Sequence, residues 1–199
     1  MTEDSPHLSV GQCATLACLL EVNAPKPGNV HRAADFDDAT LNDFAASAVA
    51  IGPQMQAATS TALGETVLRC VQATQSVAAT NTNLGTILLI APLASVPRSV
   101  ELARGNVLGN LTPDDAANVY EAIRLARPGG LGESLEMDVH SAPPDSLVDA
   151  MKLSAARDAV AAEYAGEFTL TLDKVAPLIV AAQADNLTLP NAIVHVQIQ

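Results

Sequence analysis

Apolar residues recur at helical spacing through most of this chain and stop where proline, glycine or short polar residues cluster. Between residues 60 and 79, the apolar face of the expected helix consists of Leu63, Val67, Cys70, Val71, Thr74 and Val77. Aromatic residues, which favour strands, make up only 3% of the sequence, and alanine and leucine fill most apolar positions. The pattern predicts an all-α fold, a single compact multi-helix bundle.

We expect one domain over residues 1–199, because a chain of this length can bury a full core. Ser9 and Thr112 are expected to cap helices, the second with Pro113 at its first position. Other helices are expected from about 40 to 51, over 60–79, over the apolar run from Ile87 through Pro92, over 147–164 and over 168–182. A last helix begins near Ala192 and stops in mid-pattern, so we expect that the domain continues beyond Gln199 and is truncated here.

The net charge of the chain limits the kinds of molecule that it is expected to bind. The chain carries ten Lys and Arg against 22 Asp and Glu, a formal charge of −12, which argues against nucleic acid and anionic membranes as partners. No apolar run is long enough to cross a bilayer, and the N-terminus does not resemble a signal peptide. The three cysteines are expected to be reduced core residues. We therefore expect a cytoplasmic protein that binds small molecules, and the sequence also allows a homo-oligomer.

The segment from Pro25 to Asp38 separates two expected helices and concentrates polar groups. Its prolines prevent it from extending the preceding helix. Lys26, Gly28, Asn29, His31 and Arg32 could form an anion cradle, in which the glycine lets the backbone approach and the cations neutralise phosphate oxygens. Three following acids could hold Mg²⁺, namely Asp35, Asp37 and Asp38. The alternative is a solvated surface loop with scattered charges.

A second polar segment, residues 80–86, precedes the apolar run Ile87–Ala91. Asn81, Thr82 and Asn83, with Gly85 behind them, could bond a sugar hydroxyl or receive an anion at the helix N-terminus. Helix capping is the alternative role for the same side chains. A third segment, Gly129–Glu133, could be a turn that contacts substrate, with Glu133 as a base or metal ligand, or a plain helix C-cap.

These segments, in this order, resemble the motifs of the triphosphoribosyl-dephospho-CoA synthase family, in a branch similar to archaeal members. The similar blocks are 25–32, Asp35-Phe36 with Asp38, 81–85, 128–132 and Arg157-Asp158 with Glu163-Tyr164. The resemblance implies an all-α transferase that moves the triphosphoribosyl group of ATP to the ribose 2′-hydroxyl of 3′-dephospho-CoA and releases adenine. The product is the precursor of a prosthetic group of acyl carrier proteins.

The resemblance also suggests roles for the candidate residues. Lys26 and Arg32 would grip the triphosphate, the acids at 35, 37 and 38 would hold Mg²⁺, and Asn81 and Asn83 would orient the ribose. Glu133 is our candidate general base, and Asp38 the second candidate catalytic carboxylate.

Two positions depart from the family pattern and leave an alternative open. Leu84 and Leu131 stand where better-characterised members carry cationic side chains. A related pentosyltransferase, or a nucleotide-binding protein that acts on another coenzyme-type acceptor, is therefore the alternative, and a non-catalytic helical scaffold is a further one.

Overall fold

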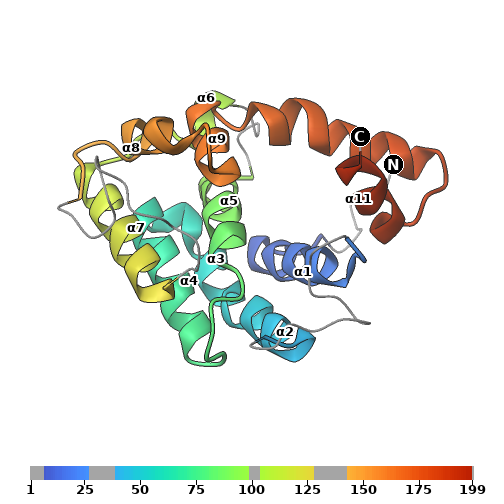
Figure 1. The fold of residues 1–199 in the computed structure, drawn as a ribbon, viewed down its shortest axis with the longest axis horizontal. Helices are drawn as coiled ribbons and strands as arrows, with labels where there is room; N and C mark the ends of the chain where they lie inside the picture. Colours follow the sequence, from blue (N-terminus) through green and yellow to red (C-terminus); the bar gives the residue numbers. More distant parts are fainter. Residues whose placement is uncertain (1–6, 27–38, 99–103, 128–142, 199) are drawn as a thin grey trace.

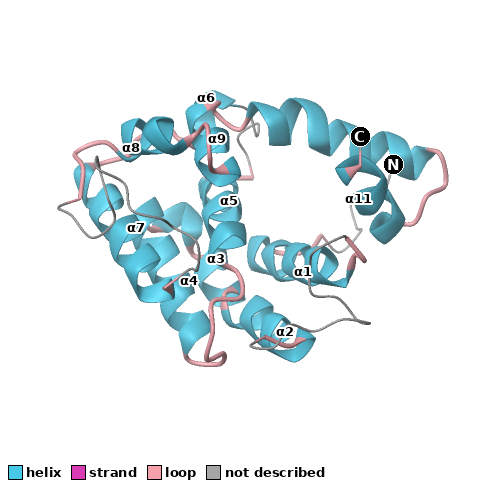
Figure 2. Ribbon diagram, in the orientation of Figure 1, coloured by secondary structure: helices cyan, strands magenta, loops and turns pink. Residues whose placement is uncertain are grey.

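The computed structural model describes residues 7–26, 39–98, 104–127 and 143–198 (Figure 1). Within these ranges every secondary-structure element is helical (Figure 2), which confirms the all-α prediction. The α-helices are α1 Val10–Asn23, α2 Leu41–Ala50, α3 Gly52–Gln56, α4 Leu63–Gln75, α5 Leu84–Ser95, α6 Arg104–Val107, α7 Pro113–Ala126, α8 Leu147–Ser154, α9 Ala159–Ala165, α10 Ala176–Ala184 and α11 Leu189–Gln197. A 3₁₀ turn, Ala58–Ser60, precedes α4, and a π-helical turn, Thr171–Val175, precedes α10.

Side-chain capping fixes where several helices begin. Ser9 accepts a hydrogen bond from the backbone N–H of Gln12 at 3.2 Å, and the Gln12 side chain accepts from the Ser9 N–H in return. Thr40 and Thr112 form the same reciprocal arrangement at the start of α2 and α7. These caps satisfy backbone donors that a helix leaves free in its first turn, which explains why the expected starts at Ser9, Thr40 and Thr112 are confirmed.

Helices α4 and α7 pack closely and form one side of the core. The backbone N–H of Gly64 donates to the buried Asp115 carboxylate at 2.7 Å. A Cβ atom on Gly64 would lie 2.4 Å from the Asp115 carbonyl oxygen, so only glycine allows this approach of the two backbones.

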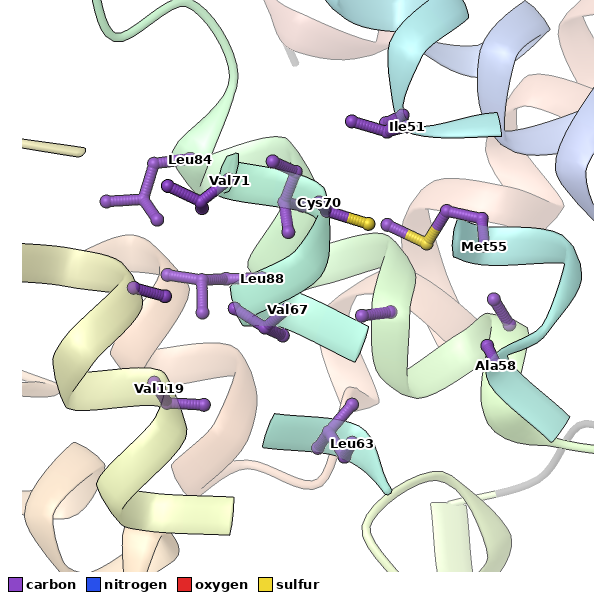
Figure 3. Packing of buried hydrophobic residues seen from close by; sticks show 14 of the residues in the cluster. Ile51, Met55, Ala58, Leu63, Val67, Cys70, Val71, Leu84, Leu88 and Val119 are labelled. Carbon is purple, nitrogen blue, oxygen red and sulfur yellow. The ribbon is translucent and has the colours of Figure 1, made fainter. Parts of the chain in front are cut away.

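Helix α5 is the central buried helix. Figure 3 shows Leu84 and Leu88 of α5 beside Val67 and Val71 of α4 and near Val119 of α7. The sequence predicts this element as a helix that continues through Pro92, and the structure confirms it. The hydroxyl of Tyr164 on α9 donates to the Leu88 carbonyl at 2.9 Å and holds α9 against α5.

The expectation of one helix over 147–164 is wrong. The structure has two helices there, because the Asp158 side chain accepts from the Ala161 N–H at 2.8 Å and starts α9 afresh. Helix α8 is capped by Ser146, whose hydroxyl accepts from the Asp149 N–H. The three cysteines also divide: Cys18 and Cys70 are buried, as expected, whereas Cys13 is exposed.

The last two helices leave the core and turn back. Figure 1 shows α10 running outward from the region of α9, and α11 reversing toward α1, which it contacts. The π-helical turn precedes Pro177, which has no N–H for a regular helical bond. Of the helices in the described ranges, none combines the length and the apolar character that a membrane span requires.

Candidate functional site

A pocket of about 390 Å³ lies where α4 ends, α5 begins and α7 ends. It is lined by Val71, Thr74, Gln75, Ala79, Thr80, Asn81, Asn83, Leu84, Leu125, Ala126 and Arg127. The lining combines apolar side chains with several neutral polar groups and one cation, a mixture typical of pockets that orient a small molecule. Its volume falls in the range of about 300–1,000 Å³ common for ligand pockets.

Asn83 has one polar atom paired and one unpaired. Its Oδ1 accepts from the Thr74 hydroxyl at 3.0 Å, and the side chain is only 8% exposed. Its Nδ2 is buried and, among the residues that the structure describes, has no hydrogen-bond partner. Leaving such a donor unpaired costs roughly 1–3 kcal/mol, so a ligand acceptor at this position would recover the loss.

The first turn of α5 has donors to spare. The Asn81 Oδ1 accepts from the Leu84 N–H at 3.1 Å, so this side chain does cap the helix. The Ile87 N–H donates to the Asn83 carbonyl at 2.8 Å. In the described part of the chain, the backbone N–H groups of Gly85 and Thr86 donate to no acceptor. The N-terminal end of the helix dipole therefore remains partly positive beside the pocket.

Within the segment 80–86, Thr82 and Gly85 lie next to neighbouring helices. The Thr82 hydroxyl donates to the Ser47 hydroxyl of α2 at 2.7 Å, and both residues are buried. A Cβ on Gly85 would lie in ordinary contact with Val160 of α9, at 3.7 Å. Of the four residues predicted in this segment, Asn81 and Asn83 line the pocket, whereas Thr82 contacts α2 and Gly85 contacts α9.

Arg127 is the pocket residue that the sequence pattern did not single out. It ends α7 in the left-handed conformation, with φ 46° and ψ 53°, and its N–H donates to the Ile123 carbonyl at 3.2 Å. Its position directly before the sequence Pro128-Gly129-Gly130 was the available signal, because segments that follow a rigid helix often carry binding residues.

A family model described as CitG, ATP:dephospho-CoA triphosphoribosyl transferase, matches residues 7–199. The chain belongs to this family. The family reaction transfers the triphosphoribosyl group from ATP to dephospho-CoA, so the chain is a transferase whose substrates are these two small molecules. A comparison with curated proteins and another with solved structures found no match.

Lys26 is the only member of the proposed anion cradle that the described ranges include. It is buried, and its Nζ pairs with the carboxylate of Glu21, one turn back at the end of α1. The remaining cradle residues, Gly28, Asn29, His31 and Arg32, lie outside the described residues. The charge of Lys26 is therefore already balanced within the protein.

The predicted metal ligands and the predicted base are not placed. Asp35, Asp37, Asp38 and Glu133 lie outside the described residues. Among residues that are described, no cluster of three or more His, Cys, Asp or Glu side chains could hold a metal ion. Carboxylates of the kind found at 35, 37 and 38 suit a hard cation such as Mg²⁺ by their donor chemistry.

Proposed function

We propose that the pocket between α4, α5 and α7 binds a nucleotide substrate of the family reaction. Its occupant would be ATP, donor of the triphosphoribosyl group, or the acceptor 3′-dephospho-CoA. The supporting observation is that residues from two distant parts of the chain line one cavity. Asn81 and Asn83 come from the block at 81–85, and Arg127 directly precedes the block at 128–132. Asn83 and Arg127, which are 44 positions apart in sequence (127 − 83), thus line the same pocket.

The reaction has three requirements that protein groups can supply. The bond between the anomeric carbon and adenine breaks, adenine leaves with the electron pair and takes up a proton, and the acceptor 2′-hydroxyl loses a proton as its oxygen bonds to that carbon. Positive charge develops on the sugar, so nearby carboxylates and oriented dipoles lower the barrier. The Nδ2 of Asn83 offers a donor to a ribose oxygen or base nitrogen, which would fix the sugar before the bond breaks.

The remaining roles follow the sequence prediction with one adjustment. Because Glu21 already balances Lys26, Arg32 is the better candidate for the triphosphate grip. We propose Glu133 as the base that accepts the hydroxyl proton, with Asp38 as the second catalytic carboxylate. Asp35, Asp37 and Asp38 are the proposed Mg²⁺ ligands, and the bound ion would neutralise triphosphate oxygens.

An assay of both half-reactions tests this proposal. The purified chain is incubated with ATP and Mg²⁺, with and without 3′-dephospho-CoA, and free adenine and the coupled product are followed by chromatography and mass. We expect adenine and product in equal amounts, only when both substrates are present. Tight binding of ATP without any release of adenine would contradict the proposal and support a non-catalytic nucleotide-binding role.

A second candidate differs only in the acceptor. Leu84, at a position where related members carry a cation, is 7% exposed and packs into the core (Figure 3). A buried leucine cannot neutralise a phosphate of the acceptor, which favours a coenzyme-type acceptor with a different charge pattern. Release of adenine with other coenzymes, but not with dephospho-CoA, would support this candidate.

A further inference from the structure

We infer that Arg127 is a substrate-binding residue whose guanidinium pairs with a phosphate group of a nucleotide held in the α4–α5–α7 pocket. The neighbouring acceptor atoms of that nucleotide would accept from the Asn83 amide. This inference rests on the proposed function and adds to it a cation that neither the sequence motifs nor the family match assigns.

The backbone at Arg127 favours a different residue. Helices that end in the left-handed conformation usually do so at glycine or asparagine. A residue with a Cβ costs roughly 1 kcal/mol more there than glycine. Arginine at φ 46° is thus not the residue that helix termination favours at this position.

The charge of Arg127 is uncompensated. Four other described cations have carboxylate partners, among them Arg69 with Glu65 and Lys152 with Asp149. Within the described ranges, Arg127 forms no ion pair and no side-chain hydrogen bond. In a protein of formal charge −12, a free guanidinium at a pocket rim is suited to bind an anion.

The pocket residues at the start of α5 supply complementary donors. The unpaired Nδ2 of Asn83 belongs to them, as do the side chains of Thr80 and Asn81. The pocket therefore presents one positive donor and several neutral donors, but no described acidic side chain. A ligand that matches this pattern carries an anionic group and, close to it, neutral oxygen or nitrogen acceptors, as a nucleotide does and a free nucleoside does not.

Both proposed substrates carry such a phosphate, so binding measurements must separate them. Dissociation constants for ATP, 3′-dephospho-CoA and adenosine are measured by calorimetry for the unmodified protein, Arg127→Gln and Arg127→Gly. Arg69→Gln serves as the matched control, because it removes the same charge from an exposed, paired arginine on α4. Thermal unfolding of each variant is recorded in parallel.

We expect Arg127→Gln and Arg127→Gly to weaken one of the two phosphate-bearing substrates by about 10- to 100-fold, in line with loss of a charge-assisted hydrogen bond. Adenosine affinity should stay within about twofold, since the wild-type residue would contact only phosphate. The substrate that loses affinity is the one whose phosphate Arg127 contacts. Arg127→Gly should not lower the melting temperature, because glycine relieves the left-handed backbone.

Unchanged affinity for both substrates in both variants, while the unmodified protein still releases adenine, would overturn the role of Arg127 and leave the proposed function intact. A lower melting temperature with unchanged affinity would assign Arg127 to helix termination instead. If the unmodified protein binds neither nucleotide and releases no adenine, the proposed function and this inference both fail.

Discussion

The Thr82 hydroxyl donates to the Ser47 hydroxyl across 2.7 Å, and the Ser47 hydroxyl in turn donates to the Asp43 carbonyl, also at 2.7 Å. This buried chain ties the segment before α5 to helix α2. The polar segment that carries Asn81 and Asn83 is therefore fixed to α2, which is how a rigid scaffold positions a binding loop.

Thr82→Val should remove this link with little change in volume. We expect a loss of about 1–2 kcal/mol in the free energy of unfolding, because the Ser47 hydroxyl loses its buried donor. Urea denaturation of Thr82→Val, Ser47→Ala and the double variant forms a thermodynamic cycle. The two single losses should sum to more than the loss in the double variant, and strict additivity would mean that the hydroxyls do not interact.

Gly64→Ala should separate α4 from α7. The added Cβ would lie 2.4 Å from the Asp115 carbonyl oxygen and 2.6 Å from its Cα, so backbone must move. We expect a loss of about 1–3 kcal/mol or more in stability, measured by urea denaturation. Gly109→Ala is the control, since its nearest contact would be 3.9 Å away. Similar stabilities for the two variants would contradict the close approach.

Asn83→Asp should weaken nucleotide binding while the fold persists. The carboxylate still accepts from the Thr74 hydroxyl, but the Nδ2 donor is lost and a negative charge enters the pocket wall. We expect at least a tenfold loss of affinity by calorimetry for the substrate that the pocket holds, ATP or 3′-dephospho-CoA, because the new charge repels phosphate. Asn110→Asp adds the same charge at an exposed position outside the pocket, and an equal loss in that variant would refute a local effect.

The buried thiols predict a fall in stability at alkaline pH. Burial, reinforced by the Glu21 carboxylate, raises the pKa of Cys18 from 9.0 to about 11, and burial raises the pKa of Cys70 to about 12. Both pKa values are higher in the folded state, so this stability is complete below pH 9. Above pH 9 the unfolded chain ionises first, and unfolding becomes easier by up to about 1.4 kcal/mol per pH unit for each thiol.

Urea denaturation between pH 8 and pH 10.5 measures this slope. Cys18→Ala should reduce it, whereas Cys13→Ala should not, because Cys13 is exposed. A slope that is the same in Cys18→Ala as in the unmodified protein would show that Cys18 does not contribute.

Much of the helical arrangement was predictable because its signals are local. Ser9 and Thr112 each indicate a helix start, because each can form a capping box with the side chain three positions later. Both starts are confirmed. The break between α8 and α9 was not predictable from spacing, since the apolar pattern continues through it. Asp158 decides the break by capping α9, a choice that depends on how α9 packs against α5 through Tyr164.

The site was predictable only in part for a similar reason. A polar run before a buried helix pointed to Asn81 and Asn83, which line the pocket. Arg127 joins them only because α7 packs against α4, a relationship that no single segment reveals. The pairing of Lys26 with Glu21 likewise depends on how the chain turns after α1, so the sequence could not tell a free cation from a balanced one.

Helix α7 has 14 residues, from Pro113 to Ala126. Asp115 lies in its first turn, and Arg127 follows its last residue. At 1.5 Å per residue this helix is about 20 Å long, so a tilt of about 10° at the Gly64 contact would move its far end, beside Arg127, by about 3–4 Å. A random mutagenesis screen for inactive enzyme should consequently recover substitutions at Gly64 and Asp115 that never meet substrate, and these would resemble binding defects until the folded fraction is measured.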